Sequence, residues 1–165
     1  FGGGHLGDDN GPQDQRGREN RVLTYTTAVF EQPLDVTGPV KAVLHASSTA
    51  IDTDWIVRIT DVWPDGTSML ICDGILRARF KDSFEVPISL VPDMPMEFEV
   101  DLWATSHVFQ VGHRMRVAIA SSGFPRWDRN WQTGRNNAYE TSGVVAHNRI
   151  FRDAVRASHV VLPVL

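Results

Sequence analysis

Apolar and polar residues alternate along much of this chain with a period of two, which is typical of half-buried β-strands. The alternation is clearest at residues 96–103 and returns at residues 114–120. In the first of these segments one face carries Met96, Phe98, Val100 and Leu102, and the other carries Glu97, Glu99, Asp101 and Trp103. No segment sustains the three-to-four-residue period of an amphipathic helix. The pattern therefore predicts an all-β protein.

Further strands are predicted wherever a short apolar alternation lies between turn residues. Asp73-Gly74 is a dipeptide suited to a tight hairpin, and Pro64-Asp65-Gly66 is a turn. The additional predicted strands are residues 22–26, 34–36, 40–48, 55–62, 67–72, 75–80, 149–151 and 158–162.

About nine strands at spacings of about eight to twelve residues favour two packed sheets, and a jelly roll is the favoured topology. Pro87, Pro92 and Pro95 fall between two predicted strands, and such prolines indicate a connection that crosses from one sheet to the other. Before the strands, residues 1–21 are rich in glycine and polar residues and are expected to be an irregular linker. Residues 22–165 are expected to form one β-sandwich domain.

Composition and charge argue against several partners. The chain has 165 residues, of which 42% are hydrophobic and 22% are charged, as in an ordinary globular domain. A net charge of −4 gives no broad basic surface, so no nucleic-acid partner is expected. No apolar run has the length of a membrane span, so no membrane partner is expected. The single cysteine, Cys72, allows no internal disulfide and lies in an apolar strand, where thiols are usually inert.

The sequence offers no self-contained catalytic or metal centre. The G-x-S-x-G signature of a nucleophile elbow is absent, and the histidines lack the close spacing of a zinc site, so no catalytic residue, metal or cofactor is predicted. His107 and His113 are interpreted as turn residues that bond to the backbone. The D-T-D-W run at residues 52–55 resembles the start of a calcium loop, although aspartates at strand ends also cap turns. Both interpretations of that run stay open.

The loop after residue 120 combines aromatic residues with arginine, a composition found at interface hot spots. We therefore treat part of this loop, together with the strand residue Trp103, as candidates for an interface. Stacked tryptophans at Trp127 and Trp131 would also suit a sugar, and the charged residues of the loop would equally serve to fix it by an ion pair. The loop candidates are Phe124, Arg126, Trp127, Asp128, Arg129 and Trp131.

A series of motifs resembles one known family. The segments LDVTGPVKAVLHASS, DTDWIVRITDVWPDGTSMLICDGILRARF and MEFEVDLWATSHVFQVGHRMRVAIASSGFPRWDRN, followed by Thr133-Gly134, are together far more specific than any single motif. They are similar to the C-terminal domain shared by Xaa-Pro dipeptidyl-peptidases, cocaine esterase and α-amino-acid ester hydrolases, the CocE/NonD hydrolase family. The similarity runs from about residue 20 onward.

The resemblance implies a galactose-binding-like jelly roll attached to an α/β-hydrolase domain that carries the serine, aspartate and histidine of the family. None of those catalytic positions maps onto this chain, so the chain is expected to be inactive alone. Its implied role is to brace the hydrolase domain, to help shape its ester or peptide pocket, and to self-associate as a homo-oligomer. The alternatives are a stand-alone carbohydrate-binding module with calcium at the aspartates, and a purely oligomerising domain.

Overall fold

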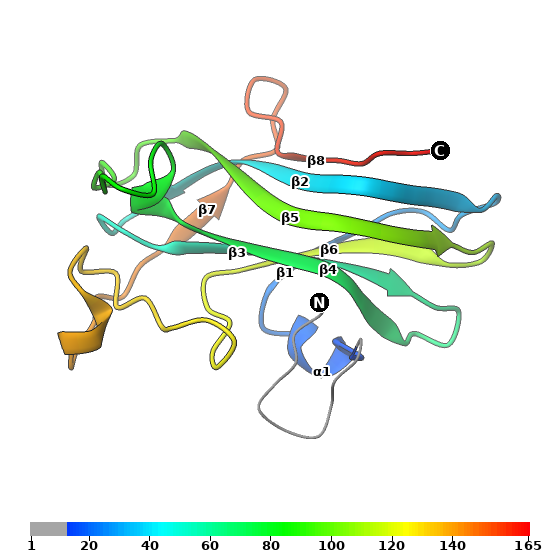
Figure 1. Cartoon of the computed structure of the whole chain (residues 1–165), viewed down its shortest axis with the longest axis horizontal. Coiled ribbons are helices and arrows are strands. Elements are labelled where there is room, and N and C mark those ends of the chain that lie inside the picture. Colours follow the sequence, from blue (N-terminus) through cyan, green and yellow to red (C-terminus); the bar gives the residue numbers. More distant parts are fainter. Residues whose placement is uncertain (1–12) are drawn as a thin grey trace.

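The computed structural model describes residues 13–165, which form two antiparallel sheets packed face to face (Figure 1). One sheet has the strand order β1-β6-β3-β4 and the other has the order β5-β2-β7, with β8 also paired to β2. The strands are β1 (Leu23–Thr26), β2 (Leu34–Ser48), β3 (Asp54–Val62), β4 (Ser68–Arg77), β5 (Met96–Phe109), β6 (Arg114–Ala120), β7 (Asn148–Ile150) and β8 (His159–Val161). The helical elements are α1 (Arg16–Glu19) and the 3₁₀ turns η1 (Ala78–Phe80) and η2 (Asn137–Tyr139).

The core lies between the two sheets and is built from the apolar faces that alternation predicts. β3 contributes Trp55, Val57 and Ile59, and β5 contributes Phe98 and Val100, all essentially removed from solvent. The polar face of β5 points outward, as predicted for Glu97, Glu99 and Asp101. The all-β sandwich prediction is confirmed, whereas the jelly-roll topology stays a prediction.

Two predicted strands, 34–36 and 40–48, are one continuous strand. Gly38 and Pro39 lie inside β2 and still pair with β5, so they do not end the strand. The pairing register shifts between Pro39 and Lys41, which is the mark of a β-bulge. At this point Trp103 on β5 has a positive φ of 66°, and its side chain is 70% exposed.

The predicted hairpin at Asp73-Gly74 is wrong, because β4 runs without interruption through both residues. A Cβ atom at Gly74 would lie 1.9 Å from the backbone oxygen of Asp101 on β5. Glycine is therefore needed here for the close approach of β4 and β5, the adjoining edge strands of the two sheets, and not for a turn. The strand predicted at 75–80 also ends early, since residues 78–80 form η1.

The far edge of β2 is covered by two short strands. β7 pairs with residues 46–48 of β2, and β8 pairs with residues 41–43. The chain leaves the sheet between them and returns through a bridge from Arg152 to Ala157. These strands agree with the predictions at 149–151 and 158–162 to within a residue or two.

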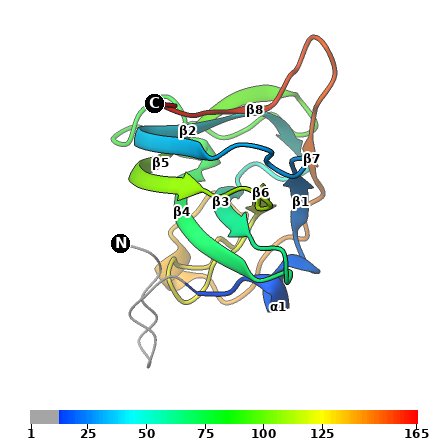
Figure 2. The same cartoon turned by 90° about the vertical axis from the view of Figure 1, so that its right-hand side faces the viewer.

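The first twelve residues of the predicted linker lie outside the described residues. Residues 13–21 contact the edge of β4, where the Gln15 amide donates to the Ser68 carbonyl at 2.7 Å and the Leu70 amide donates to the Gln13 carbonyl at 3.2 Å. Figure 2 shows α1 on the outer side of the β1-β6-β3-β4 sheet. Within residues 13–165 there is no helix with the length and apolar character needed to cross a bilayer.

Cys72 is expected to be unreactive in the folded chain. Its side chain is buried on the core side of β4, and burial, aided by the neighbouring Asp73 charge, raises the pKa of the thiol to about 12 from an ordinary 9.0. At pH 8 this shift lowers the population of the thiolate by roughly a thousandfold, and the thiolate is the reactive form of cysteine. We expect a disulfide reagent to modify Cys72 at least that much more slowly in buffer than in denaturant. Similar rates in both solutions would contradict this packing.

Candidate functional site

The aromatic loop, residues 121–134, begins at the end of β6 and lies over the outer face of the β1-β6-β3-β4 sheet. It contains a cis peptide bond between Phe124 and Pro125, and the Trp127 amide donates to the Gly123 carbonyl at 3.3 Å. A Cβ atom at Gly123 would come within 2.7 Å of the Trp127 ring and 3.1 Å of Ile56. Gly123 therefore allows the loop to fold closely onto the sheet.

Asn130 anchors the middle of the loop to the start of β3. Its side-chain amide donates to Asp52 at 3.0 Å and to Asp54 at 2.8 Å, and its oxygen accepts the Gln132 amide at 2.8 Å. Both aspartates are almost completely buried. Asn130 was not among the predicted site residues, although it ends the quoted F-P-R-W-D-R-N motif.

The same two carboxylates are paired with arginines from the end of β4 and from η1. Arg77 donates to both oxygens of Asp54, at 2.9 and 3.1 Å, while an Arg79 nitrogen lies 3.3 Å from Asp52. The D-T-D run therefore fixes the loop and a strand end. Within residues 13–165 no group of three or more histidine, cysteine, aspartate or glutamate side chains is arranged to hold a metal ion.

Burial and hydrogen bonding compete at this anchor. Burial raises the pKa of Asp52, and the bonds from Asn130 and the Arg79 amide oppose that rise. For Arg77, the hydrogen bond to Asp54 raises the pKa of the guanidinium. The anchor thus holds its charges in the interior through paired partners, the arrangement that buried ions require.

Two aromatic rings of the loop are stacked against its own arginines. Arg126 pairs with Asp73 at 2.9 Å and stacks over Trp127, with 4.7 Å between the guanidinium carbon and the ring centre. Arg129 stacks over Phe124 at the same distance. Both rings thus have one face covered from within the loop.

The remaining predicted interface residues are dispersed. Trp131 is half-buried and packs against Gly143, while Asp128 is exposed at the loop surface. Trp103 belongs to the other sheet, so the structure does not join it to the loop. Trp127 and Trp131 are each half-buried by their own chain.

The Asp73 carboxyl, which pairs with Arg126 of the loop, makes the free energy of unfolding depend on pH. Burial raises its pKa above the ordinary value, with Arg126 and then Arg58 opposing the rise. The native state therefore binds more protons than the unfolded state between the two pKa values, and stability falls as the pH rises through that window. We expect the wild-type free energy of unfolding, minus that of Asp73→Asn, to be smaller at pH 7 than at pH 4 in urea titrations. A larger difference at pH 7 would show that the Arg126 ion pair outweighs burial.

His107 and His113 do not bond to the backbone through their rings, as the sequence suggested. Both rings contact the buried carboxylate of Asp61, His107 at 3.2 Å and His113 at 2.9 Å. In the described part of the chain, no serine, threonine or cysteine side chain is hydrogen-bonded to either ring. The cluster fixes the end of the sandwich where β3, β5 and β6 meet, and it presents no nucleophile–base pair.

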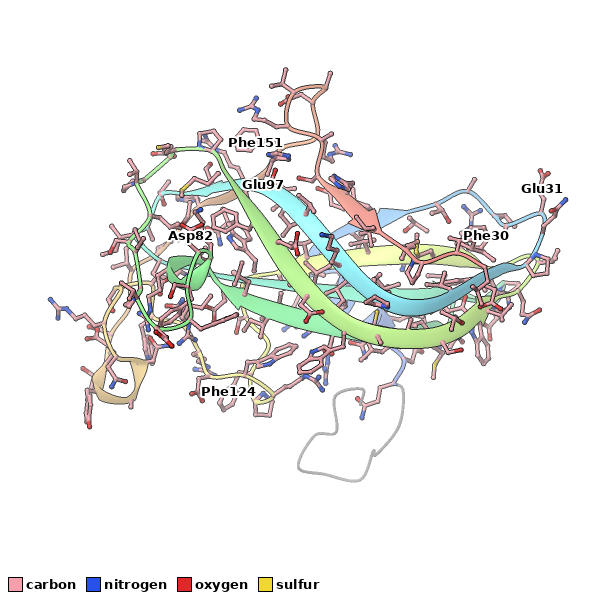
Figure 3. The ribbon with its side chains drawn as sticks, turned by 45° about the horizontal axis from the view of Figure 1, so that its top comes forward. Phe30, Glu31, Asp82, Glu97, Phe124 and Phe151 are labelled. Atoms are coloured by element: carbon pink, nitrogen blue, oxygen red, sulfur yellow. The ribbon has the colours of Figure 1, made fainter. Side chains whose placement is uncertain are left out.

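Sequence reasoning missed an apolar surface at the end of the sandwich that carries the loop and η2 (Figure 1). Hydrogen bonds join its segments, from Leu90 to Ile51 and from Val144 to Trp131, and Gly134 packs against Ile51. We call it the apolar end surface, and its exposed members are Ile51, Phe84, Val86, Ile88, Val91, Met94, Tyr139, Val144 and Val145. Its residues lie in connections without periodicity, so strand patterns could not reveal it. Figure 3 shows Asp82 at this end and Phe30 and Glu31 at the opposite end.

Comparison with known proteins gives a consistent result. Residues 8–161 match the family described as the X-Pro dipeptidyl-peptidase C-terminal non-catalytic domain. The chain is 44% identical over 161 residues to cocaine esterase from Rhodococcus sp., a match that covers 95% of this chain and 28% of the esterase. It is 30% identical over 169 residues to a putative serine esterase from Mycobacterium bovis, covering 92% of this chain and 25% of that protein.

Two solved structures share the fold closely. An aminopeptidase from a marine sediment Thaumarchaeota archaeon superposes with a TM-score of 0.90 at 35% identity, covering 93% of this chain and 28% of the aminopeptidase. An α-amino-acid ester hydrolase superposes with a TM-score of 0.90 at 33% identity, covering 93% of this chain and 27% of the hydrolase. The chain therefore spans between a quarter and a third of each of these relatives.

Proposed function

The chain belongs to the family of X-Pro dipeptidyl-peptidase C-terminal non-catalytic domains, and from that premise we propose that it braces the catalytic domain of a serine hydrolase acting on esters or Xaa-Pro peptides. In this role the domain contributes a docking face and a rigid support for the catalytic pocket, and the catalytic serine, aspartate and histidine belong to the other domain. The related esterases and ester hydrolase support this assignment.

The apolar end surface is the observation that carries the proposal. Phe84 is 85% exposed and Val145 is 82% exposed, although large apolar side chains in water are costly when they gather in one place. Exposed apolar side chains gathered at one end of a domain favour an interaction site there. The proposed occupant is the catalytic domain, because this chain covers only 28% of the esterase and 27% of the ester hydrolase. The rest of each relative is long enough to form a further domain.

The loop supports this surface from one side. Asn130, Asp52 and Asp54 hold residues 121–134 against the sheet, and Gly134 packs on Ile51 of the apolar end surface. A firmly held loop costs less conformational entropy when a partner docks, so the anchor favours a preformed interface. The loop is thus proposed to act through its rigidity and not by reacting.

The test places charge on the apolar end surface of the longer hydrolase that we propose carries this domain. Val86→Glu and Val145→Glu are expected to lower the rate of ester hydrolysis at least about tenfold, because a carboxylate at an apolar interface is desolvated without a partner. The matched control is Val155→Glu, which changes an 87% exposed valine in the β7–β8 connection and should leave the rate unchanged.

Melting temperatures distinguish a loss of docking from a loss of folding in these variants. Both end-surface variants should melt within a few degrees of wild type when made in the 165-residue chain, because their side chains already face solvent. Full activity in both variants of the longer hydrolase would exclude this surface as the docking face.

A further inference from the structure

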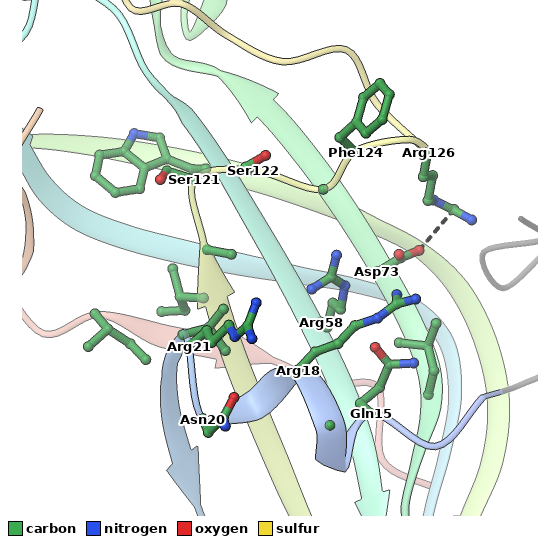
Figure 4. A pocket seen from close by; sticks show the side chains of 18 of the residues that line it. Gln15, Arg18, Asn20, Arg21, Arg58, Asp73, Ser121, Ser122, Phe124 and Arg126 are labelled. Carbon is green, nitrogen blue, oxygen red and sulfur yellow. Dashed lines mark ion pairs between the residues drawn. The ribbon is translucent and has the colours of Figure 1, made fainter. Parts of the chain in front are cut away.

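A basic hollow lies on the outer face of the β1-β6-β3-β4 sheet, between α1 and the aromatic loop (Figure 4). Its volume is about 880 Å³. The floor is formed by Arg58 on β3 and Asp73 on β4, and one wall by Gln15 and Arg18. The opposite wall contains Ser122, Phe124 and Arg126.

The charge of the hollow is opposite to that of the chain. Four arginines line it, and Asp73 is the acidic residue among its described lining residues, whereas the whole chain carries a net charge of −4. Glu19, the nearby acidic residue of α1, forms an ion pair with Arg116 and accepts a hydrogen bond from the Ser68 hydroxyl. The four arginines are Arg18, Arg21, Arg58 and Arg126.

Arg58 is the central group of this hollow. It lies opposite Asp73 in the β3–β4 register and opposite Ala118 in the β3–β6 register. The Asp73 carboxylate pairs with Arg126 at 2.9 Å, and among residues 13–165 no side chain or carbonyl forms a hydrogen bond or ion pair with Arg58. Burial is the main cause that lowers the pKa of Arg58; the charge of Asp73 opposes this shift, and the charges of Arg18 and Arg126 add to it.

A half-buried guanidinium carries five N–H donors in a fixed planar fork, and that fork matches the two oxygens of a carboxylate. In Figure 4, Arg18 and Arg58 enter the hollow from different elements, so an anion placed there would meet cations from both sides. From this geometry we propose that the hollow is a binding site for a carboxylate, with Arg58 as its principal ligand. The proposal does not depend on the proposed function.

The carboxylate has two candidate sources, and an experiment can distinguish them. One is a free small carboxylate from solution. The other is the chain itself, because Asp8 and Asp9 precede Gln13, at the rim of the hollow, by five and four residues. An extended chain of that length reaches at most about 18 Å. Asp8 and Asp9 lie outside the described residues.

The experiment titrates the whole 165-residue chain with sodium acetate at constant ionic strength, with chloride as the balancing salt, and follows the Nε–Hε signals of the arginines by NMR. The same titration is run on the Asp8→Asn/Asp9→Asn double variant. Each is repeated with Arg58→Gln, with Arg58→Lys as a variant that keeps the charge, and with Arg149→Gln as a control on an exposed arginine of β7.

Saturable acetate binding to the wild-type chain that weakens at least about tenfold in Arg58→Gln, and not in Arg149→Gln, supports the site and assigns it to a free carboxylate. Binding that emerges only in the double aspartate variant, with the same dependence on Arg58, supports the site and assigns it to the chain's own carboxylates. The proposal is overturned if acetate fails to bind either chain, or if binding is unchanged in Arg58→Gln. Should Arg58→Gln not fold, a less than twofold change in Arg58→Lys would overturn Arg58 as the bidentate ligand.

Discussion

Replacing Gly74 with alanine should destabilise the domain by about 3 kcal/mol or more, the largest effect that we expect from any single methyl group in this chain. The added Cβ would lie 1.9 Å from the Asp101 oxygen and 2.9 Å from its carbonyl carbon. Because these are backbone atoms of β5, no rotamer change can relieve the overlap, and the edge strands of the two sheets must separate. For a domain of this size, such a loss lowers the melting temperature by roughly 6–12 °C.

Gly17→Ala is the matched control for this substitution. A Cβ atom at Gly17 meets no described atom within 4 Å, and the residue lies within α1, where alanine is intrinsically favoured by up to about 1 kcal/mol. Urea unfolding of both variants measures the contrast. Equal stabilities for Gly74→Ala and Gly17→Ala would mean that β4 and β5 do not approach each other as described.

Asp54→Ala is the second substitution with a large expected effect. Asp54 is 1% exposed, and its removal leaves Arg77 without its two bonds and Asn130 without one of its acceptors. Breaking a buried ion pair by removing one partner typically costs about 3–5 kcal/mol, because the remaining charge stays in the interior. We expect a loss in that range by urea unfolding, together with faster hydrogen exchange in the loop at residues 121–134.

The control for Asp54→Ala is an ion pair at the surface. Lys41 and Glu99 are 2.8 Å apart on the outer face of the other sheet, where the Lys41 side chain is 44% and the Glu99 side chain 60% exposed. Glu99→Ala should cost about 1 kcal/mol or less, since water screens exposed pairs. If Asp54→Ala were as mild as Glu99→Ala, the D-T-D anchor would not be what holds the loop.

Strand patterns predicted most of the fold because alternation records which side chains face the core. On that basis β3 and β6 were located to within a residue, and β5 was located at its start, although it runs on to Phe109 beyond the predicted 96–103. Asp73-Gly74 misled the prediction because glycine serves both tight turns and close backbone contacts, and a local sequence cannot tell the two apart. The distinction depends on Asp101, which is distant in sequence and adjacent only after the sheets pack.

The candidate site was predicted less completely, for a related reason. The aromatic and charged residues of the loop were visible in the sequence, but their mutual pairing was not. Asn130 acts through aspartates almost eighty residues earlier, and Arg58 acquires its setting from α1 and the loop together. Arg77 and Arg79 lie two residues apart in the predicted strand 75–80, where alternation would put them on one side, and the D-T-D run supplies carboxylates. Their pairing is therefore the part of the site that sequence signals could have suggested.

Two surfaces of the domain are therefore proposed to bind different partners. The apolar end surface is proposed to dock a catalytic domain, and the basic hollow on the outer sheet face is proposed to hold a carboxylate. The loop lies between them, with Phe124 and Arg126 in the wall of the hollow and Gly134 against Ile51. Its contacts are those of a support, because Arg126 pairs with Asp73 of the sheet and Asn130 bonds to the buried Asp52 and Asp54.

The most direct test of this account is the hydrolysis of p-nitrophenyl acetate by the purified 165-residue chain, measured with and without a serine-directed phosphonate inhibitor. The account predicts the rate of buffer alone, unaffected by the inhibitor, because the chain supports catalysis and does not perform it. Saturable hydrolysis that the inhibitor abolishes would place a catalytic serine within this domain and contradict the account.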